Sequence, residues 1–580
     1  MAGSLTVYVT AQAFEGELAG AEGLTRAAGL LRGAGVNRVV LEGYRGGCSV
    51  PEAVLRAARD FFEAEGFATL GGLMPVYGEG VGQRAEGVET RLPCFCYSVE
   101  ATLEALEIEV RKLARLFGQV VVDDAFLTSC RCARCDELRH GRDWGAFRRD
   151  LLCGVAGRLA DAAHHENPAA RFTVKFPQYY DRYARFGYDA ARFPAIFDAV
   201  WQGTETRDPA TLAYGYVEPY QGYFNLQWMR ACAGDRLETG WFDSLDCTDQ
   251  HFYDQAVTTH LAAPGDVTVF CYNDELLASR KMARLAKARP ELDALWEAAS
   301  GPVGMHVVKP PNCDGGGDLH LFDSLGMLGV PLVPATKLEP TMRSALVPAH
   351  AAGVQAVREA VPKALMAGRH VIATVDALRG MADDLDLLEF FGYRPSGVAP
   401  GRAQIAAFAA RGRRYEVSHP VYVAGDLAPV DASVLVWAEF AACEHGVVRV
   451  PFVTAKSFAS GGRAVVWNFG SFDAGAYDIR EQLNVPVPCD LLHLPKPILD
   501  LVRRTATSAL GFAIEAPARV AAFVFAEHVV FVNYAASPAE VNIRGLPWRA
   551  DTLRSDSPRT RCSDGTLFLA SHSHALIQRA

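Results

Sequence analysis

The sequence has no uninterrupted apolar run that approaches the roughly 20 residues a membrane-spanning helix needs. It also lacks an excess of positive charge, since 57 Lys and Arg residues stand against 67 Asp and Glu residues, for a net charge of -10. This balance argues against nucleic acid or an anionic membrane as the main partner. The first residues, MAGSLTVYVT, lack the basic segment and apolar core of a signal peptide. We therefore expect a cytoplasmic globular protein.

Two nucleotide-binding signatures are also missing. No G-x-G-x-x-G follows the first expected strand, Leu5–Thr10, so a dinucleotide-binding fold has no support. The triple glycine Gly315–Gly317 lacks the Lys and Ser/Thr of a phosphate loop, and we interpret it as a flexible turn. The 14 cysteines occur without an export signal, which favours reduced thiols, some of them bound to metal, over a disulfide framework.

Strand and helix patterns alternate along residues 1–300. Eight apolar strands in this rhythm predict a (β/α)8 TIM barrel. A doubly wound open sheet is the competing layout, but it would not need polar residues at the end of nearly every strand. The expected strands are Leu5–Thr10, Arg38–Glu42, Ala68–Val76, Val120–Asp124, Arg171–Phe176, Ala199–Gly203, Leu237–Phe242 and Val267–Cys271.

Two smaller domains are expected after the barrel, because the chain is too long for one core. Residues 301–495 continue the βαβ rhythm, which predicts a flavodoxin-like α/β domain, and residues 402–470 turn into short β-rich runs. Residues 496–580 begin with the helix Lys496–Leu510 and then alternate as short strands, which predicts a C-terminal β-sandwich. The chain is therefore predicted to be an α/β protein of three domains.

Carboxylates fall at or just past the ends of the expected barrel strands, where such barrels carry out their chemistry. Glycoside cleavage requires two carboxyl groups, one protonated and one ionised. Asp123 and Asp124 end strand four, and because neighbours in a strand alternate faces, we expect one to be catalytic and the other to orient it. Any single acid here could equally be a helix cap or a loop residue. The acids are Glu42, Asp123, Asp124, Glu205, Asp243, Asp246, Asp274 and Glu275.

Aromatic and basic residues accompany these acids. Aromatic rings beside carboxylates suit a saccharide, although many are simply core residues; Tyr179, Trp201 and Trp241 are our candidates for contact with the sugar. Lys175 and Arg207 also follow strand ends, where they could hold the substrate or neutralise the clustered acids.

Five cysteines lie in two of the expected loops. Cys130, Cys132 and Cys135 follow strand four with the spacing C-x-C-x-x-C, and Cys94 and Cys96 follow strand three. Zinc in a structural site takes four ligands in a tetrahedron, so the second loop would supply the fourth. We expect a closed, structural zinc site beside the acids, with unmetallated thiols as the alternative.

These motifs resemble those of the family-42 glycoside hydrolases, the bacterial β-galactosidases. The resemblance rests on Asp123-Asp124 followed by SCRCARC and WGAFRRDLL, and on the segments GMLGVPLVPAT and AGRHVIAT in the middle domain. It implies a glutamine-amidotransferase-like middle domain, a zinc loop beside the strand-four acid, and a homo-oligomer, a trimer or a dimer.

The resemblance has two departures. The family has Asn-Glu at the end of strand four and a Glu on strand seven, whereas this chain has Asp123-Asp124 and Asp243. β-Galactosidase specificity therefore does not carry over. Glu205 on strand six could supply the second carboxylate instead, as in barrel α-galactosidases that have an Asp nucleophile on strand four.

The sequence thus predicts a glycoside hydrolase that acts on terminal sugars or small glycosides through Asp124 or Asp123 with Glu205, Asp243 being the rival second carboxylate. Glu42, Asp274, Lys175 and Arg207 would join the aromatic residues in binding the sugar. A non-catalytic carbohydrate-binding relative that kept the barrel is the alternative. A metal-dependent barrel hydrolase ranks last, since few histidines fall at strand ends.

Overall fold

The computed structural model describes residues 3–87, 93–208, 217–313, 315–398, 402–419, 421–440, 447–469, 490–563 and 565–580. The chain divides into two compact units. The first contains the described residues up to 217 together with 225–296, and the second contains 218–224 and the described residues from 297 onward. Within the described ranges, no helix is both long and apolar enough to cross a membrane.

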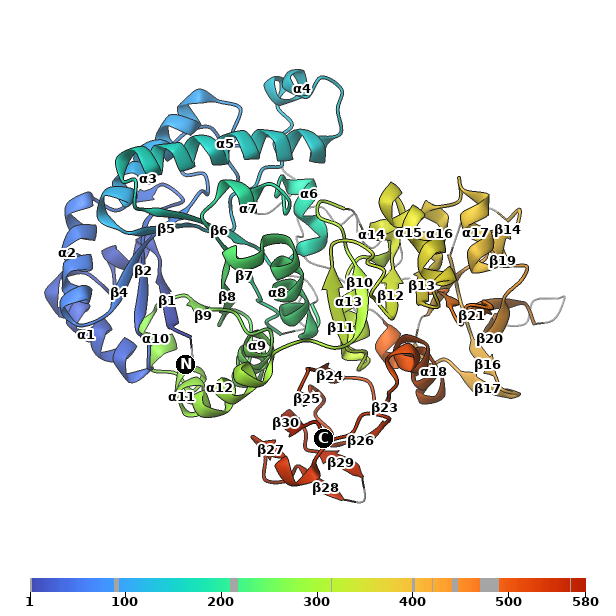
Figure 1. Cartoon of the computed structure of the whole chain (residues 1–580). Coiled ribbons are helices and arrows are strands. Elements are labelled where there is room, and N and C mark those ends of the chain that lie inside the picture. The colour runs from blue at the N-terminus through green and yellow to red at the C-terminus, as the bar shows by residue number, and fades with distance from the viewer. Residues whose placement is uncertain are drawn as a thin grey trace. The chain divides into compact units, whose positions relative to one another are not determined.

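The first unit is a closed parallel barrel, as the strand rhythm predicted (Figure 1). The ring closes because β1 pairs with both β2 and β9. The short strand β3 (Cys48–Ser49) pairs antiparallel with β2 outside the ring. The barrel strands are β1 (Leu5–Val9), β2 (Arg38–Arg45), β4 (Ala68–Met74), β5 (Gln119–Val122), β6 (Arg171–Phe176), β7 (Ala199–Gly203), β8 (Leu237–Asp243) and β9 (Asp266–Phe270).

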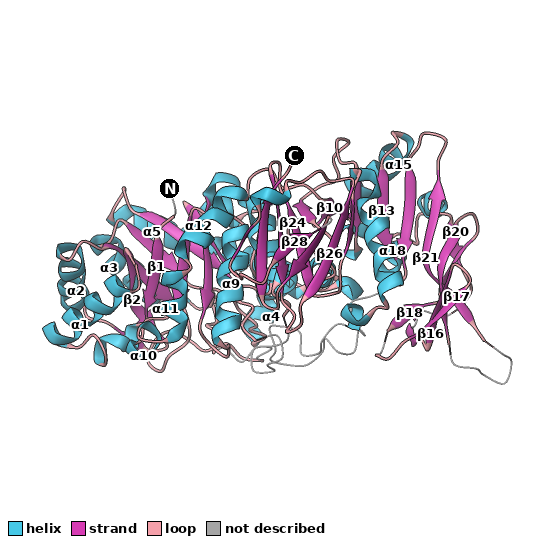
Figure 2. Cartoon of the chain, turned by 90° about the horizontal axis from the view of Figure 1, so that it is seen from below, coloured by secondary structure: helices cyan, strands magenta, loops and turns pink. Residues whose placement is uncertain are grey.

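Helices surround this ring, and Figure 2 shows them outside the strands. In α3, the buried residues Leu106, Val110 and Leu113 recur at helical spacing and form its inner face. The helices are α1 (Gly20–Gly33), α2 (Glu52–Ala64), α3 (Glu100–Leu116), α4 (Ala133–Arg139), α5 (Trp144–Glu166), α6 (Tyr183–Phe186), α7 (Phe193–Ile196), α8 (Tyr220–Ala233), α9 (Asp249–Leu261), α10 (Asp274–Leu277), α11 (Arg280–Lys287) and α12 (Arg289–Ala298).

In the second unit, a nine-stranded mixed sheet follows the barrel. Its parallel half has the order β11-β10-β12-β13-β22 and agrees with the expected βαβ rhythm. The β-rich runs after residue 402 extend the same sheet in antiparallel order. The strands are β10 (Met305–Val308), β11 (Leu332–Ala335), β12 (Ser344–Val347), β13 (His370–Thr374), β16 (Ala407–Ala410), β17 (Arg413–Glu416), β20 (Ser433–Glu439), β21 (Arg449–Ser457) and β22 (Arg463–Trp467).

Helices and two small two-stranded antiparallel sheets complete this part. One sheet pairs β14 (Tyr393–Pro395) with β19 (Leu427–Pro429), and the other pairs β15 (Arg402–Gln404) with β18 (Tyr422–Ala424). The helices are α13 (Leu321–Met327), α14 (Ala349–Ala352), α15 (Gln355–Met366), α16 (Val375–Gly380) and α17 (Leu385–Phe391).

The C-terminal strands form two antiparallel four-stranded sheets around their own apolar core. One sheet has the order β23-β26-β29-β28 and the other β24-β25-β30-β27, which agrees with the predicted sandwich. The strands are β23 (Ala513–Glu515), β24 (Val520–Val524), β25 (His528–Asn533), β26 (Ala539–Arg544), β27 (Arg554–Ser555), β28 (Arg561–Ser563), β29 (Thr566–Leu569) and β30 (Ser573–Gln578).

The helix α18 (Lys496–Thr507), which precedes the sandwich in the sequence, also hydrogen-bonds to the mixed sheet. The Ser344 hydroxyl donates to the carbonyl of Ala506 at 2.8 Å, and the indole of Trp467 donates to Thr505 Oγ1 at 3.0 Å. Sequence pattern alone assigns this helix to the last domain, because tertiary hydrogen bonds leave no periodic signal.

Candidate active site

Lys175 joins the strand-end acids into one cluster. It is the penultimate residue of β6, and its side chain is only 2% exposed. Its Nζ lies 2.7 Å from Asp124 Oδ2 and 2.7 Å from Glu205 Oε1. The nearer oxygen of Asp123 is 3.6 Å away. Three carboxylates from the ends of two different strands therefore surround one ammonium group, as the barrel arrangement predicted.

Asp123 and Asp124 both reach this ammonium, although strand alternation predicted that they would face opposite ways. The strand β5 ends at Val122, and Asp124 lies in a turn, so the alternation of a strand does not apply there. Asp123 Oδ1 accepts a hydrogen bond from the backbone N–H of Asp124 at 2.7 Å. Asp123 thus holds the backbone that carries Asp124, whose side chain is 21% exposed.

Glu205 is a buried acid with a raised pKa. Burial raises its pKa to about 7, since the opposing charge of Lys175 is countered by Asp124 and Asp243. Its Oε1 accepts from Lys175, and its Oε2 has no hydrogen-bond partner among the described residues. A buried carboxyl group that titrates near neutrality can donate and accept a proton at physiological pH.

The opposite balance holds at Lys175. Burial alone would lower the pKa of its ammonium group, but the charges of Asp124, Glu205 and Asp123 outweigh burial and raise it. The ammonium therefore stays charged. Of the two roles left open by the sequence, neutralising the clustered acids is the one that these contacts support.

Arg45 is a residue of the candidate site that was not among the residues predicted from the sequence. Its guanidinium contacts Glu42 at 2.8 Å and Asp123 at 3.0 Å. Glu42 is fully buried and also accepts from the Tyr8 hydroxyl at 2.6 Å and from the Ala11 N–H at 2.8 Å. With its oxygens engaged in this way, Glu42 anchors Arg45 rather than facing a substrate. The signal was a basic residue three positions after a strand-end acid.

Asp243 is held by an ion pair. Arg207 approaches it with Nε at 3.0 Å from Oδ1 and with a terminal nitrogen at 2.5 Å from Oδ2. The amide of Leu245 also donates to Oδ1 at 3.1 Å. Because both oxygens accept hydrogen bonds from the chain itself, Asp243 is less available to a sugar than Asp124.

The structure gives the three candidate aromatics different positions. Trp241 lies beneath the cluster, with Lys175 Nζ 4.4 Å from its ring centroid. Tyr179 is buried, and burial together with Asp124, Tyr183 and Glu205 raises the pKa of its hydroxyl well above 10. Its hydroxyl has no hydrogen-bond partner among the described residues.

Trp201 and Asp274 do not join the cluster. Trp201 is fully buried in the barrel interior, and its indole donates to Glu238 at 3.1 Å, the acid that also accepts from the first residue of β5. The ring therefore points to the opposite end of the barrel from the acids. Asp274 begins α10 and is paired with Arg26 at 2.7 Å on the surface. Neither position suits the sugar contact that the sequence predicted.

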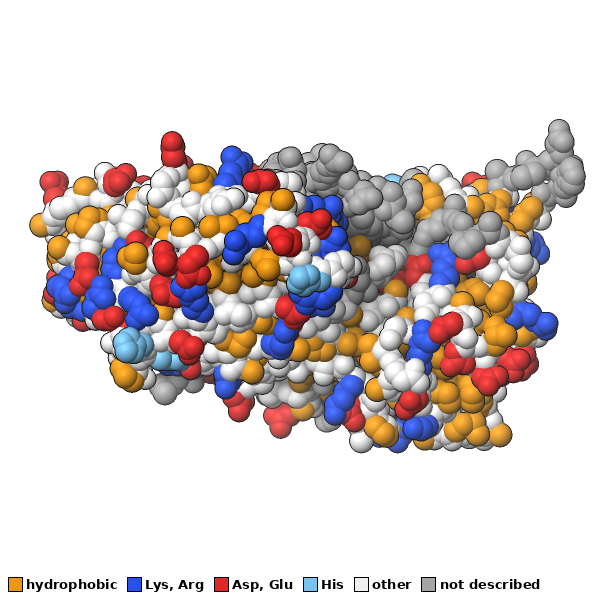
Figure 3. All heavy atoms as spheres, turned by 90° about the horizontal axis from the view of Figure 1, so that it is seen from above, with side chains coloured by type: hydrophobic (Ala, Val, Ile, Leu, Met, Phe, Trp, Pro, Cys, Tyr) orange, Lys and Arg blue, Asp and Glu red, His pale blue; other side chains and the backbone are white. Residues whose placement is uncertain are grey.

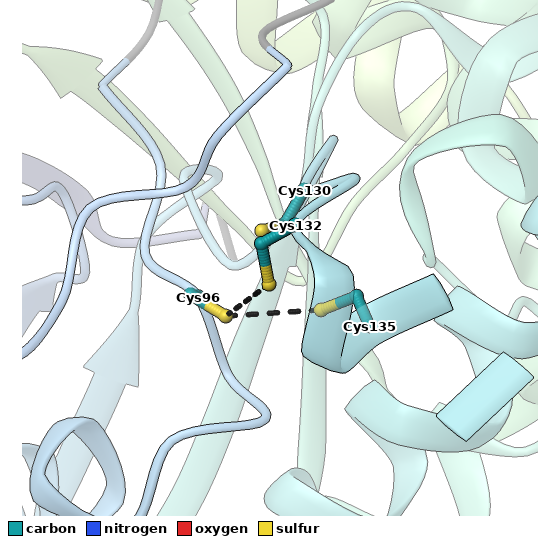
Figure 4. Close-up of side chains that lie close together, drawn as sticks. All are labelled: Cys96, Cys130, Cys132 and Cys135. Atoms are coloured by element: carbon teal, nitrogen blue, oxygen red, sulfur yellow. Dashed lines mark hydrogen bonds between the residues drawn. The ribbon is translucent and has the colours of Figure 1, made fainter. Parts of the chain in front are cut away.

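Four of the five loop cysteines converge (Figure 4). The sulfur atoms of Cys96, Cys130, Cys132 and Cys135 all lie within 4.8 Å of one another, and all four residues are buried. Cys96 Sγ is 3.9 Å from Cys132 Sγ and 3.7 Å from Cys135 Sγ. Cys94 is not part of this group; its thiol is buried, and burial raises its pKa to about 12.

These distances fit a tetrahedral metal ion. A zinc–thiolate bond of about 2.3 Å places the sulfurs of a regular tetrahedron about 3.8 Å apart. An all-thiolate set of four is the ligand set of a closed structural site, with no open position for a substrate. Hydrogen bonds also join the two loops that carry these cysteines. Thr128 Oγ1 donates to the carbonyl of Phe95 at 3.1 Å, and the amide of Arg131 donates to the carbonyl of Glu86 at 2.8 Å.

The barrel corresponds to a known family. The family of probable glycosyl hydrolase catalytic domains matches residues 3–297, and the chain belongs to it. An uncharacterized protein of Saccharolobus solfataricus is 21% identical over 374 residues, which cover 58% of this chain and 61% of that protein. The predicted glycoside hydrolase class is thus confirmed at the level of the family.

Solved structures share the whole architecture. The β-galactosidase of Bacillus circulans sp. alkalophilus superposes with a TM-score of 0.65 at 12% identity, covering 100% of this chain and 99% of that one. Gan42B, a family-42 β-galactosidase from G. stearothermophilus, gives 0.64 at 13% identity, over 100% and 98% of the two chains. The β-galactosidase of Rahnella sp. R3 gives 0.63 at 12% identity, over 100% and 99%. At these identities the likeness establishes the fold.

Proposed function

We propose that this protein is a retaining glycoside hydrolase that removes terminal sugars or cleaves small glycosides, with Asp124 as nucleophile and Glu205 as acid/base. The observation that carries the proposal is the single ammonium of Lys175, which contacts both carboxylates at 2.7 Å. It holds together two acids that are 81 positions apart in the sequence, at the strand ends where barrel enzymes bind substrate.

The separation of the acids supports retention. Because Asp124 Oδ2 and Glu205 Oε1 each lie 2.7 Å from one nitrogen, these oxygens cannot be more than twice that distance apart. Retaining enzymes place their two carboxyl groups about 5–5.5 Å apart, whereas inverting enzymes need about 6.5–9.5 Å to admit a water molecule. The shorter separation leaves no room for a water between this pair.

The environments of the two acids support the assignment of roles. Glu205 has a pKa raised to about 7 by burial, so a large share of it carries a proton near neutral pH and can donate it to the leaving oxygen. Asp124 is the more exposed of the two and accepts from Lys175, which suits a carboxylate that attacks the sugar. Asp123 positions Asp124 by accepting a hydrogen bond from its backbone N–H, and Arg45 in turn pairs with Asp123.

The four-cysteine group supports a structural zinc ion. Cys96, Cys130, Cys132 and Cys135 would hold the ion, which would brace the loop that begins with Asp123 and Asp124. Such an ion supplies no chemistry to the reaction; it fixes two loops where the chain has few regular hydrogen bonds. The nucleophile then sits on a rigid support.

Aryl glycosides of different leaving-group acidity test the assignment. Asp124→Asn should lower kcat by several orders of magnitude on every substrate. Glu205→Gln should lower kcat/KM by about 10²–10⁴-fold on glycosides with poor leaving groups, yet spare dinitrophenyl glycosides, which leave without a proton. Asp274→Asn is the matched control, since it removes a strand-end carboxylate on the surface and should leave turnover unchanged. Equal losses for Glu205→Gln on both kinds of leaving group would reject the acid/base role.

A further inference from the structure

A hollow lies in the mixed sheet of the second unit. It has a volume of about 370 Å³ and lies over β16, β17 and β20, which Figure 2 shows at the antiparallel end of the sheet. Its lining includes Ala409, Arg411, Arg413, Arg414, Trp437 and Arg449.

The strand register explains why the sheet is hollowed there. Arg414 pairs with Ala409, Ala409 with Trp437, and Trp437 with Pro451, so these residues form one row across four strands. Residues in such a row share one face of the sheet. Ala409 is small, and it separates two large side chains, Arg414 and Trp437. The result is a trough with an alanine floor, a half-buried indole on one side and a guanidinium on the other.

One buried acid, Glu439, holds two of the arginines at this trough. Glu439 is only 3% exposed, and it pairs with Arg414 at 2.9 Å and with Arg449 at 2.8 Å. The two guanidinium groups are therefore held in place around a shared carboxylate. Restraining long side chains in advance lowers the entropic cost of binding a ligand, although both arginine side chains stay about half exposed, at 52% and 56%.

Two more arginines of the lining, Arg411 and Arg413, add positive charge. Arg411 and Arg413 are exposed, and within the described ranges neither has a recorded ion pair. Arg411 also takes a positive φ of 50° in the two-residue turn before β17, a position that favours Gly or Asn. The lining thus has four arginines and one acid, whereas acidic and basic side chains are interspersed on the face in Figure 3.

We propose that this hollow binds an anionic saccharide, one that carries carboxylate or sulfate groups, at a site separate from the barrel acids. A volume of about 370 Å³ falls in the range of small-ligand sites, about 300–1,000 Å³. A sugar ring would stack on Trp437, and its anionic groups would face Arg411, Arg413 and Arg414. The choice of a saccharide, rather than another anion, rests on the proposed function.

Calorimetric titration tests this site. The full chain carrying Glu205→Gln, which keeps the probe intact, is titrated with tetragalacturonate and with a neutral galactose tetrasaccharide. The acidic probe should bind at least tenfold more tightly than the neutral one, and the difference should shrink as salt is raised. Trp437→Ala and the double variant Arg411→Ala/Arg413→Ala should each raise the Kd for tetragalacturonate at least tenfold. Arg394→Ala, an exposed arginine in the same unit outside the hollow, should not.

Three outcomes would overturn the proposal. Equal binding of the acidic and neutral probes would remove the role of charge. Unchanged affinity in both hollow variants would place the site elsewhere. If the hollow variants sediment differently from the parent chain and no saccharide binds, the hollow is a contact between two copies of the chain. Because binding is measured without turnover, failure of the aryl glycosides to react would leave this result intact.

Discussion

Replacing Lys175 with methionine is the perturbation whose consequences the structure defines most fully. The change keeps an unbranched, flexible side chain that ends one atom short of the ammonium nitrogen, and it removes the charge that contacts Asp124 and Glu205 at 2.7 Å. Two effects follow, one on the pH dependence of activity and one on stability.

The pH effect arises at Glu205. Burial raises the pKa of this group to about 7, and the largest force opposing that rise is the charge of Lys175. Without the ammonium, the pKa should rise further, because burial, Asp124 and Asp243 all act in the same direction. We expect a shift of at least about one pH unit, equivalent to about 1.4 kcal/mol. The high-pH limb of the activity profile, where the acid loses its proton, should move upward by that amount.

The stability effect arises because Asp124 and Glu205 lose the positive charge that they contact. Removing one member of a buried ion pair leaves uncompensated charge and typically costs about 3–5 kcal/mol. Part of this loss is relieved when Glu205 binds a proton instead, so the variant should be least stable at high pH. Urea unfolding at pH 6 and pH 9 measures the difference.

Lys112→Met is the matched control for both effects. Lys112 is also buried, and it contacts Glu109 at 2.5 Å and the carbonyl of Val50 at 2.9 Å on the outer side of the barrel. This variant should lose stability without moving the activity limb. If Lys175→Met leaves the limb in place, or if Lys112→Met moves it equally, the limb does not report Glu205 and the electrostatic reasoning fails.

Three further predictions follow from single contacts. Because the folded-state pKa of Glu205 is raised from 4.5 to about 7, the free energy of unfolding should fall by about 3 kcal/mol as the pH rises between those values; Glu205→Gln should lack that fall in urea titrations. Metal analysis should find about one zinc ion per chain in the wild type and in Cys94→Ser but much less in Cys96→Ser, and equal content in both variants would contradict the four-thiolate site. Gly203→Ala should lower kcat at least tenfold because its Cβ would lie 2.4 Å from Glu205 Oε2, whereas Gly154→Ala meets nothing within 4 Å and should leave kcat unchanged.

The barrel and its order could be read from the sequence because the relevant signals are local. The strands β6 and β7 have the predicted bounds, since each is an apolar run closed by a turn. The convergence of Asp124, Lys175 and Glu205 then follows from topology, because the ends of parallel strands meet at one end of a barrel. The approach of the loop with Cys94 and Cys96 to the C-x-C-x-x-C loop follows for the same reason, but only the structure selects Cys96 over Cys94.

The remaining features depend on geometry that periodicity does not record. Alternation predicts that Trp201 and Trp241 face inward, but not whether a ring points toward the acids or away from them; only Trp241 lies against Lys175. The end of β5 at Val122 decides that Asp123 and Asp124 both reach the ammonium. The contact of Arg45 with Glu42 goes with a register shift in β2 between Glu42 and Tyr44, since regular alternation would place two residues three apart on opposite faces of the strand.

The identity of the nucleophile tests the central claim most directly. A 2-deoxy-2-fluoro glycoside with a dinitrophenyl leaving group should glycosylate the enzyme with one sugar as dinitrophenolate leaves, and peptide mass spectrometry locates the resulting glycosyl ester. We expect the label on Asp124, with none formed in Asp124→Asn. A label on Asp243, or release of the inverted product with no ester formed, would contradict it.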